Sequence, residues 1–214
     1  MNRRSMKILI LTSSPNDNGL TSACAEAARQ GVIDGRSPAR LVDLNDLSIS
    51  RCAVHNDGWG TCKSKHHCQL QDDFQSLQET IEQAEGYVFI TPVYFGEPSE
   101  PMKAMIDRLR RCEATKDEGA GEKSILADKP MVLIAAAGGT GHGTLSCLEM
   151  MERFALRLKA KVFDTIPVTK NTRDYQLETI HDALAAMTAA PPIPELSPAK
   201  RKERRPTHRR RRRS

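Results

Sequence analysis

The sequence contains no apolar run close to the roughly 20 residues that a helix needs to cross a bilayer. Its first apolar run, residues 8–11, follows basic residues but is too short for the core of an export signal. We therefore expect a cytoplasmic protein with no membrane partner, whose six cysteines are thiols or ligands rather than disulfides.

The positive net charge of +5 is concentrated at one end of the chain. Residues 200–214 hold ten Lys/Arg and one Glu, a charge of +9, so the rest of the chain carries −4. The overall charge is therefore no argument that a folded domain binds nucleic acid. We expect a domain over residues 1–190 and a disordered, Pro/Arg-rich tail over 191–214, which binds polyanions only non-specifically.

Short apolar runs alternate with segments of helical periodicity. Strands are expected at 6–12, 39–44, 87–93, 130–139 and 161–168, and helices at 21–31, 72–86, 100–112, 144–160 and 173–190. This alternation predicts the α/β class, with a doubly wound parallel sheet and helices on both faces. Five strands favour the flavodoxin-like order 2-1-3-4-5 over a six-stranded dinucleotide-binding fold.

Ligands of such sheets bind beyond the carboxyl ends of the strands, so the loops there are candidate sites. The first, "SSPNDNGLTSA" at 13–23, feeds a helix whose free N–H groups suit a phosphate. Its side chains offer further hydrogen bonds from Ser14, Asn16, Asn18, Thr21 and Ser22. It has no lysine and no Walker A spacing, which disfavours a nucleoside triphosphate. A polar loop without a ligand is the alternative.

Two further loops follow the third and fourth expected strands. In "TPVYFGEPSEPMK", residues 91–103, two aromatic residues and a glycine can either pack on a planar ring or cap the core. In "AAAGGTGHGT", residues 135–144, four glycines allow the backbone to come close to a ligand, and a flexible turn is the alternative.

Together these loops resemble the NADPH-dependent FMN reductase family of the flavodoxin-like superfamily, over roughly residues 6–190. The matching stretches are "KILILTSSPNDNGLTS", "YVFITPVYFGEPSEPMKAMIDR" and "VLIAAAGGTGHG". The resemblance implies an FMN whose phosphate lies on the first loop, with contacts from Ser14, Asn16, Thr21 and Ser22. It implies ring contacts from Pro92, Val93, Tyr94, Phe95, Gly96, Gly138, Gly139 and Gly141.

The resemblance also implies a function, an FMN-dependent NAD(P)H oxidoreductase that passes electrons to a small acceptor such as a flavin or a quinone, and a homo-oligomer. The cofactor would carry this chemistry, so we assign no catalytic residue. The first loop departs from the family, which usually has Gly-Ser-Pro-Arg where this chain has Ser13-Ser14-Pro15-Asn16. Without the arginine, FMN is expected to be held less tightly. Alternatives are a flavin electron carrier without a nicotinamide site, and polyanion binding through the tail.

An expected insert at 45–71 contains most of the stretch "RCAVHNDGWGTCKSKHHCQLQDDF". Iron–sulfur flavoproteins, a branch of the same family, have a compact four-cysteine motif at this place. The candidate metal ligands here are Cys52, His55, Cys62 and Cys68.

This candidate metal site has only three cysteines, whereas iron–sulfur clusters usually take four thiolates. Zinc bound by three cysteines and a histidine is chemically sound, but the spacing is irregular. The interpretation we favour is a metal-free loop, ordered by Trp59 and its flanking glycines, that covers the flavin or forms part of a subunit contact.

Overall fold

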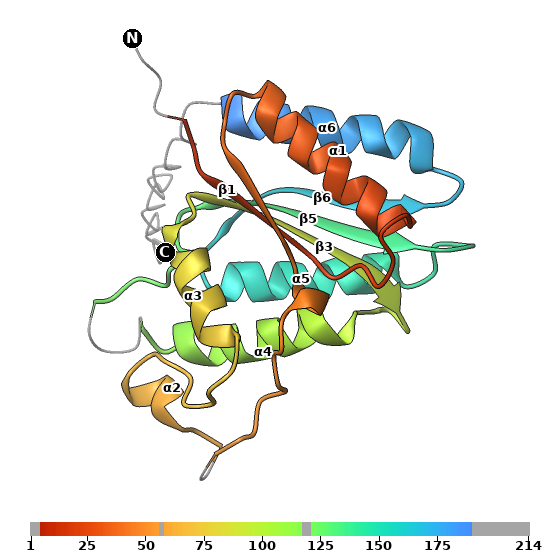
Figure 1. Ribbon diagram of the computed structural model, residues 1–214. Coiled ribbons are helices and arrows are strands. Elements are labelled where there is room, and N and C mark those ends of the chain that lie inside the picture. The colour runs from red at the N-terminus through yellow and green to blue at the C-terminus, as the bar shows by residue number, and fades with distance from the viewer. Residues whose placement is uncertain (1–4, 56–57, 117–120, 190–214) are drawn as a thin grey trace, which may run out of the picture.

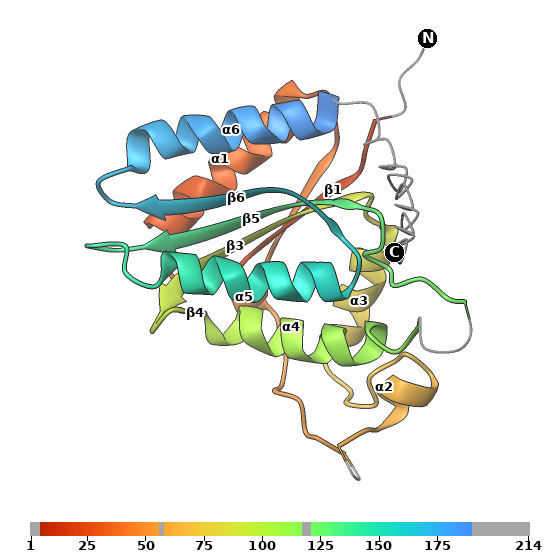
Figure 2. The same ribbon diagram turned by 180° about the vertical axis from the view of Figure 1, so that it is seen from behind.

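The computed structural model describes residues 5–55, 58–116 and 121–189 and shows a twisted sheet between two layers of helices (Figures 1 and 2). Five of its strands are parallel: β1 (Ile8–Thr12), β2 (Ala39–Asp43), β3 (Gly86–Tyr94), β5 (Pro130–Ala137) and β6 (Lys161–Thr169). Their order is β2-β1-β3-β5-β6, and a short β4 (Glu97–Pro98) pairs antiparallel with β3. The predicted α/β class and flavodoxin-like strand order are confirmed.

Strand β1 shows why the sequences of the central strands are continuous apolar runs. All five of its residues are buried. Ile8 and Ile10 point to one helical layer, while Leu9 and Leu11 point to the other. Burial of each of these side chains stabilises the fold by about 1.5–3 kcal/mol.

The helices divide between the two faces of the sheet. Helices α1 (Leu20–Asp34) and α6 (Arg173–Ala189) cover one face (Figure 1). The other face is covered by α3 (Phe74–Gln83), α4 (Glu100–Glu113) and α5 (Thr144–Arg157) (Figure 2). All five long helices therefore lie where the periodicity predicts them.

Three short elements are not predicted from the sequence: the 3-10 helix η1 (Leu44–Asp46), α2 (Thr61–Ser64) and β4. The expected end of the first helix at Gly31 is wrong, because α1 continues to Asp34. A Cβ on Gly31 would lie 2.2 Å from the carbonyl oxygen of His181. Gly31 therefore allows α6 to pack closely on α1 rather than ending the helix.

The tail expected at 191–214 lies outside the described residues, so its disorder and the domain boundary stay predictions. Over the ranges that the structure describes, no helix is long and apolar enough to cross a membrane.

His181 on α6 makes two hydrogen bonds, and the one to Asp34 joins α6 to α1. Its Nε2 lies 2.9 Å from Asp34 Oδ2, and its Nδ1 lies 2.9 Å from Asp182 Oδ1. The hydrogen bonds to Asp34 and then to Asp182 raise the pKa of His181. Both carboxylates favour the protonated imidazole, so this contact depends on pH.

We expect His181→Asn to lower the unfolding temperature in acid more than in base. Since the folded-state pKa is raised, the stabilisation is full below the unfolded pKa of about 6.5 and is lost as pH rises through the folded value. Thermal unfolding of wild type and variant across this range measures the difference. His67→Asn, at an exposed position outside this contact, serves as the control. A difference that grows with rising pH would contradict the assignment.

Candidate functional site

Three loops meet at the carboxyl edge of the sheet (Figures 1 and 2). They follow β1, β3 and β5, which are adjacent in the sheet, with Thr12 paired to Ile90 and Ile90 paired to Ile134. From β1 the chain continues to β2 on one side of β1, and it then returns to β3 on the other side. The strand order therefore reverses between β1 and β3, which flank the topological switch point. Ligands of open α/β sheets bind at this point.

The first loop, residues 13–19, is braced by its own hydroxyl groups. Ser14 Oγ donates to the carbonyl of Asn16 at 2.7 Å and lies 3.1 Å from Ser22 Oγ, which also donates to that carbonyl. Ser14 and Thr21 are buried, whereas the side chains of Asn16 and Asn18 are exposed. Of the five predicted phosphate residues, the two asparagines are thus the most accessible to a ligand.

The start of α1 has features that favour an anion. Gly19 is its N-cap and provides no side-chain hydrogen bond, and the first turn holds no acidic residue. The first N–H groups of the helix therefore have no side-chain acceptor of their own, and the helix dipole adds a partial positive charge. Asn45 Nδ2 donates to the Ser14 carbonyl at 2.8 Å and ties this loop to η1.

The second loop is a tight hairpin between β3 and β4. Tyr94 pairs with Glu97, which leaves Phe95 and Gly96 as a two-residue turn. Their φ values are +52° and +80°, as a type I′ turn requires. Pro92 is buried and Val93 is half-buried, so of the predicted ring contacts it is Tyr94 and Phe95 that project into solvent.

The third loop, residues 138–143, combines open space with a close contact to the second. No atom lies within 4 Å of a Cβ built on Gly138 or Gly139. A Cβ on Gly143, where φ is +84°, would lie 2.7 Å from Gly96 Cα. The structure thus brings the second and third loops together at Gly143, the one glycine of 135–144 that is not among the predicted ring contacts.

A cluster of three buried hydroxyls lies beneath these loops. Ser99 Oγ donates to Ser13 Oγ at 2.7 Å, and Ser13 Oγ donates to Thr91 Oγ1 at 3.2 Å. The Ser99 N–H donates to Thr91 Oγ1 at 3.0 Å. The cluster fixes the ends of β1 and β3 and the start of α4 relative to one another. Sequence reasoning missed it, although Ser13 and Thr91 both follow apolar runs.

A cavity of about 660 Å³ borders the first two loops, between η1 and the start of α4. Asn45 lines the cavity and bonds to Ser14 of the first loop. Pro98 also lines it and pairs with Val93 of the second loop. Its wall carries charges of both signs, from Arg51, Lys103, Glu100 and Asp107, and Lys103 Nζ lies 2.6 Å from Asp107 Oδ2. Its volume lies within the range of small-molecule sites.

The four candidate metal ligands line a second, far smaller cavity, of about 20 Å³. Arg108 and Arg111 line it too, and Arg108 Nη2 donates to Cys68 Sγ at 3.3 Å. The Arg111 guanidinium lies 4.6 Å from the ring centre of Trp59. The four predicted ligands are Cys52, His55, Cys62 and Cys68, and the fold brings them to one place.

These donors nevertheless do not fit a metal or a cluster. In the described ranges no three His, Cys, Asp or Glu side chains come together as a metal-binding group. A cavity of about 20 Å³ holds about one water molecule, far less than a cluster of iron and sulfide needs. The described residues thus show no metal-binding arrangement, and the role of these four residues as ligands stays a prediction.

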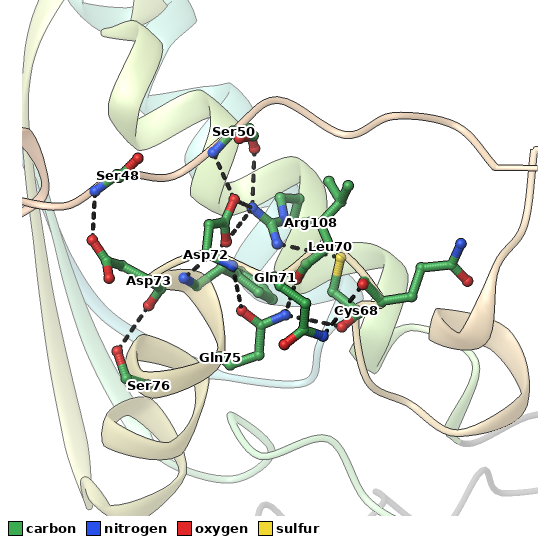
Figure 3. A network of polar contacts seen from close by, with 12 residues as sticks. Ser48, Ser50, Cys68, Leu70, Gln71, Asp72, Asp73, Gln75, Ser76 and Arg108 are labelled. Atoms are coloured by element: carbon green, nitrogen blue, oxygen red, sulfur yellow. Dashed lines mark hydrogen bonds and ion pairs between the residues drawn. The ribbon is translucent and has the colours of Figure 1, made fainter.

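An ion pair between Arg108 and Asp72 holds this loop instead (Figure 3). Arg108 Nη1 lies 2.6 Å and 2.9 Å from the two Asp72 oxygens and donates to the Ser50 carbonyl at 3.1 Å. The Arg108 side chain has no exposed surface and stacks 4.3 Å from the ring centre of Phe74. Arg108 on α4 thus binds both ends of the 48–72 loop, at Ser50 and at Asp72.

Asp72 also lies two residues before α3 and bonds to its first turn. It accepts the N–H groups of Ser50 at 2.9 Å and Phe74 at 3.1 Å, and its own N–H donates to Gln75 Oε1 at 3.2 Å. The bonds of Asp72 with the Phe74 N–H and the Gln75 side chain resemble a capping box, although the N-cap residue is Asp73. Burial alone would raise the pKa of the Asp72 carboxyl, but the hydrogen bonds from Arg108, Ser50 and Phe74 outweigh it and lower the pKa.

A family model described as NADPH-dependent FMN reductase matches residues 6–172. An iron–sulfur flavoprotein of Methanocaldococcus jannaschii is 27% identical over 105 residues, 49% of this chain and 52% of that protein. An FMN-dependent NADH:quinone oxidoreductase of Alcanivorax borkumensis is 31% identical over 150 residues, 65% of this chain and 74% of that protein. The match spans only about half the length of the iron–sulfur flavoproteins.

Solved structures confirm the fold. An NAD(P)H:quinone oxidoreductase from Methanothermobacter marburgensis superposes with a TM-score of 0.66 at 17% identity, over 86% of this chain and 96% of that one. An FMN-dependent NADH-azoreductase from Bacillus anthracis in complex with FMN gives 0.63 at 12% identity, over 86% of this chain and all of that one.

We expect Asp72→Asn to destabilise the fold by about 3–5 kcal/mol near neutral pH, because it leaves the Arg108 charge buried without a counter-charge. The neighbouring Asp107→Asn breaks a half-exposed pair with Lys103 and should cost less than about 1 kcal/mol. Urea unfolding measures both.

The difference between wild type and Asp72→Asn should also depend on pH. Because the Asp72 pKa is lowered, its contribution is present above the unfolded value of about 3.9 and is lost as pH falls through the folded value. Equal losses in Asp72→Asn and Asp107→Asn would show that the buried pair does not hold the loop.

Proposed function

Because this chain belongs to the NADPH-dependent FMN reductase family, we propose that it is an FMN-dependent NAD(P)H oxidoreductase that passes electrons to a small acceptor. The observation that carries the proposal is the convergence of three loops at the switch point, with an uncapped helix start on one side and open glycine backbone on the other. Assembly into a homo-oligomer and a cytoplasmic location belong to the same proposal.

The phosphate of FMN would lie at the start of α1. The backbone N–H groups there would bind it, with Asn16 and Asn18 exposed beside them and Ser22 half-buried. Ser14 and Thr21 are buried, so they would support the loop that binds the phosphate. The first loop offers no arginine, so neutral donors and the helix dipole would provide the affinity.

The flavin ring would lie between the second and third loops. The backbone of Gly138 and Gly139 is uncovered, and side chains at these positions would fill the space above it. Backbone N–H groups of the hairpin can stabilise negative charge on the ring. The predicted ring contacts are Pro92, Val93, Tyr94, Phe95, Gly96, Gly138, Gly139 and Gly141.

FMN, when bound, supplies the electron transfer between nicotinamide and acceptor, and the chain supplies binding and orientation. In the overall reaction, NADPH and one proton from solvent reduce a quinone to a hydroquinone and leave NADP⁺. The cavity of about 660 Å³ beside the loops has room for a small substrate.

The proposal predicts that the protein loaded with FMN oxidises NADPH or NADH when a quinone is present. Anaerobic bleaching of the flavin absorbance by the nicotinamide nucleotide measures the first half of the reaction, and absorbance at 340 nm measures turnover. FMN binding without any bleaching would instead indicate an electron carrier, and the absence of FMN binding would remove both functions.

Gly138→Ala tests the position of the ring. Because no protein atom lies within 4 Å of the added methyl group, the apo-protein should unfold at the wild-type temperature. FMN affinity, measured by quenching of flavin fluorescence, should fall about tenfold or more, because the methyl group meets only the ligand.

Gly139→Ala is the matched variant for this test. Its φ of +63° strains any residue other than glycine, so it should lower both stability and affinity. Unchanged FMN affinity in Gly138→Ala would place the ring elsewhere.

A further inference from the structure

Cys52 lies where two cavities meet. It is half-buried and lines both the cavity of about 660 Å³ beside the first two loops and the cavity of about 20 Å³ in the Cys/His stretch. Cys62 and Cys68 also line the smaller cavity, but both are buried. A small molecule that enters the larger cavity therefore meets Cys52 before it meets the other two cysteines.

The Arg108 guanidinium holds Cys68 next to the segment that carries Cys52 (Figure 3). Its Nη1 donates to the Ser50 carbonyl at 3.1 Å, two residues before Cys52, and its Nη2 donates to Cys68 Sγ at 3.3 Å. The cavity that Cys52 and Cys68 both line holds about one water molecule. A disulfide joins two sulfur atoms at about 2.05 Å, so only a movement across this small cavity is needed to form one.

The remaining three cysteines lie in the core and are not positioned to react. Cys24, Cys112 and Cys147 have no exposed surface. Burial raises the pKa of the Cys24 and Cys147 thiols to about 12, so both stay protonated near neutral pH. Since the thiolate is the reactive form of cysteine, these residues serve as internal references for oxidation at Cys52.

We propose that Cys52 is oxidised by a small hydroperoxide and then forms a reversible disulfide with Cys68. The Cys52 sulfur attacks the O–O bond of the hydroperoxide, so that an S–O bond forms, the O–O bond breaks, and the alcohol (water, for hydrogen peroxide) leaves. The Cys68 sulfur then attacks the Cys52 sulfur, an S–S bond forms, and the oxygen leaves as water. The two thiols thus give two electrons and two protons to the hydroperoxide, and a small thiol reverses the step by exchange.

Cys68 rather than Cys62 is the partner of Cys52, because Arg108 bonds both to the Cys68 sulfur and to the chain beside Cys52. This inference goes beyond the proposed function and does not rest on it, since the hydroperoxide, not a nicotinamide nucleotide or a quinone, is the reactant. It also competes with the predicted metal site, because a metal bound by Cys52 and Cys68 would occupy both sulfurs.

The test counts and maps thiols in the full chain. Protein that has been reduced and freed of reductant is treated with a small excess of hydrogen peroxide, unfolded in iodoacetamide and digested with trypsin. We expect the labelled thiols to fall from six to four, because one disulfide takes two, and dithiothreitol to restore all six. Mass spectrometry should find peptide 52–63 joined to peptide 66–103, with the label on Cys62.

Serine variants identify the two partners. Cys52→Ser and Cys68→Ser should each abolish the disulfide, whereas Cys62→Ser, the matched control, should still form it. In Cys68→Ser, dimedone should trap Cys52 as the sulfenic acid. Because serine places a polar group at a buried position, Cys68→Ala repeats this measurement with an apolar side chain.

Three results would overturn the proposal. All six thiols could remain after peroxide treatment. The disulfide could contain Cys62, or persist in Cys52→Ser. The purified protein could also contain one equivalent of iron or zinc that protects Cys52 and Cys68 from peroxide, which would assign both sulfurs to a metal. Loss of NADPH oxidation would refute the proposed function alone, because the thiol count needs neither nucleotide nor FMN.

Discussion

Parallel pairing of β1 with β3 and of β3 with β5 is the constraint on which the rest of the site depends. It brings three loops that are far apart in the sequence to one edge of the sheet. The hydroxyls of Ser13, Thr91 and Ser99 fix the strand ends beneath them, and the Gly96–Gly143 contact joins the second loop to the third. A ligand at this edge meets backbone N–H groups and glycine surfaces more than reactive side chains, as suits chemistry carried by a cofactor.

The order of the Cys/His stretch at 51–74 depends on other contacts than those of the three loops. In a family that includes iron–sulfur flavoproteins, a cysteine-rich loop at this place suggests a cluster. Here the buried Arg108–Asp72 pair holds the loop, and the Arg108 guanidinium also donates to Cys68. The cavity between the cysteines has room for about one water molecule. Charge pairing and packing therefore order the loop, and two of its three cysteines, Cys62 and Cys68, are buried.

Long elements could be predicted from the sequence because each carries its own pattern. The apolar run of β1 and the buried face of α4, which includes Met102, Met105 and Leu109, can be recognised without knowledge of their partners. Elements of two to four residues, such as β4 and α2, are too short to show a period. The end of α1 does not follow from the sequence, because Gly31 makes a contact with α6 that no local pattern reveals.

The site was predictable to the same extent. The three loops follow from strand ends, but the hydroxyl cluster joins residues 78 and 86 positions apart, and the Arg108–Asp72 pair joins residues 36 apart. Such contacts depend on tertiary packing alone. The exposure of Phe95 likewise follows from the hairpin with β4, which was not foreseen.

Hydrogen exchange of the protein with and without FMN tests the central claim most directly, because it reads the three loops separately. We expect FMN to slow exchange of backbone amides at 13–22, 92–97 and 138–143, and to leave those at 58–72 unchanged. Slowed exchange confined to the 58–72 loop, or no change at the start of α1, would contradict the account.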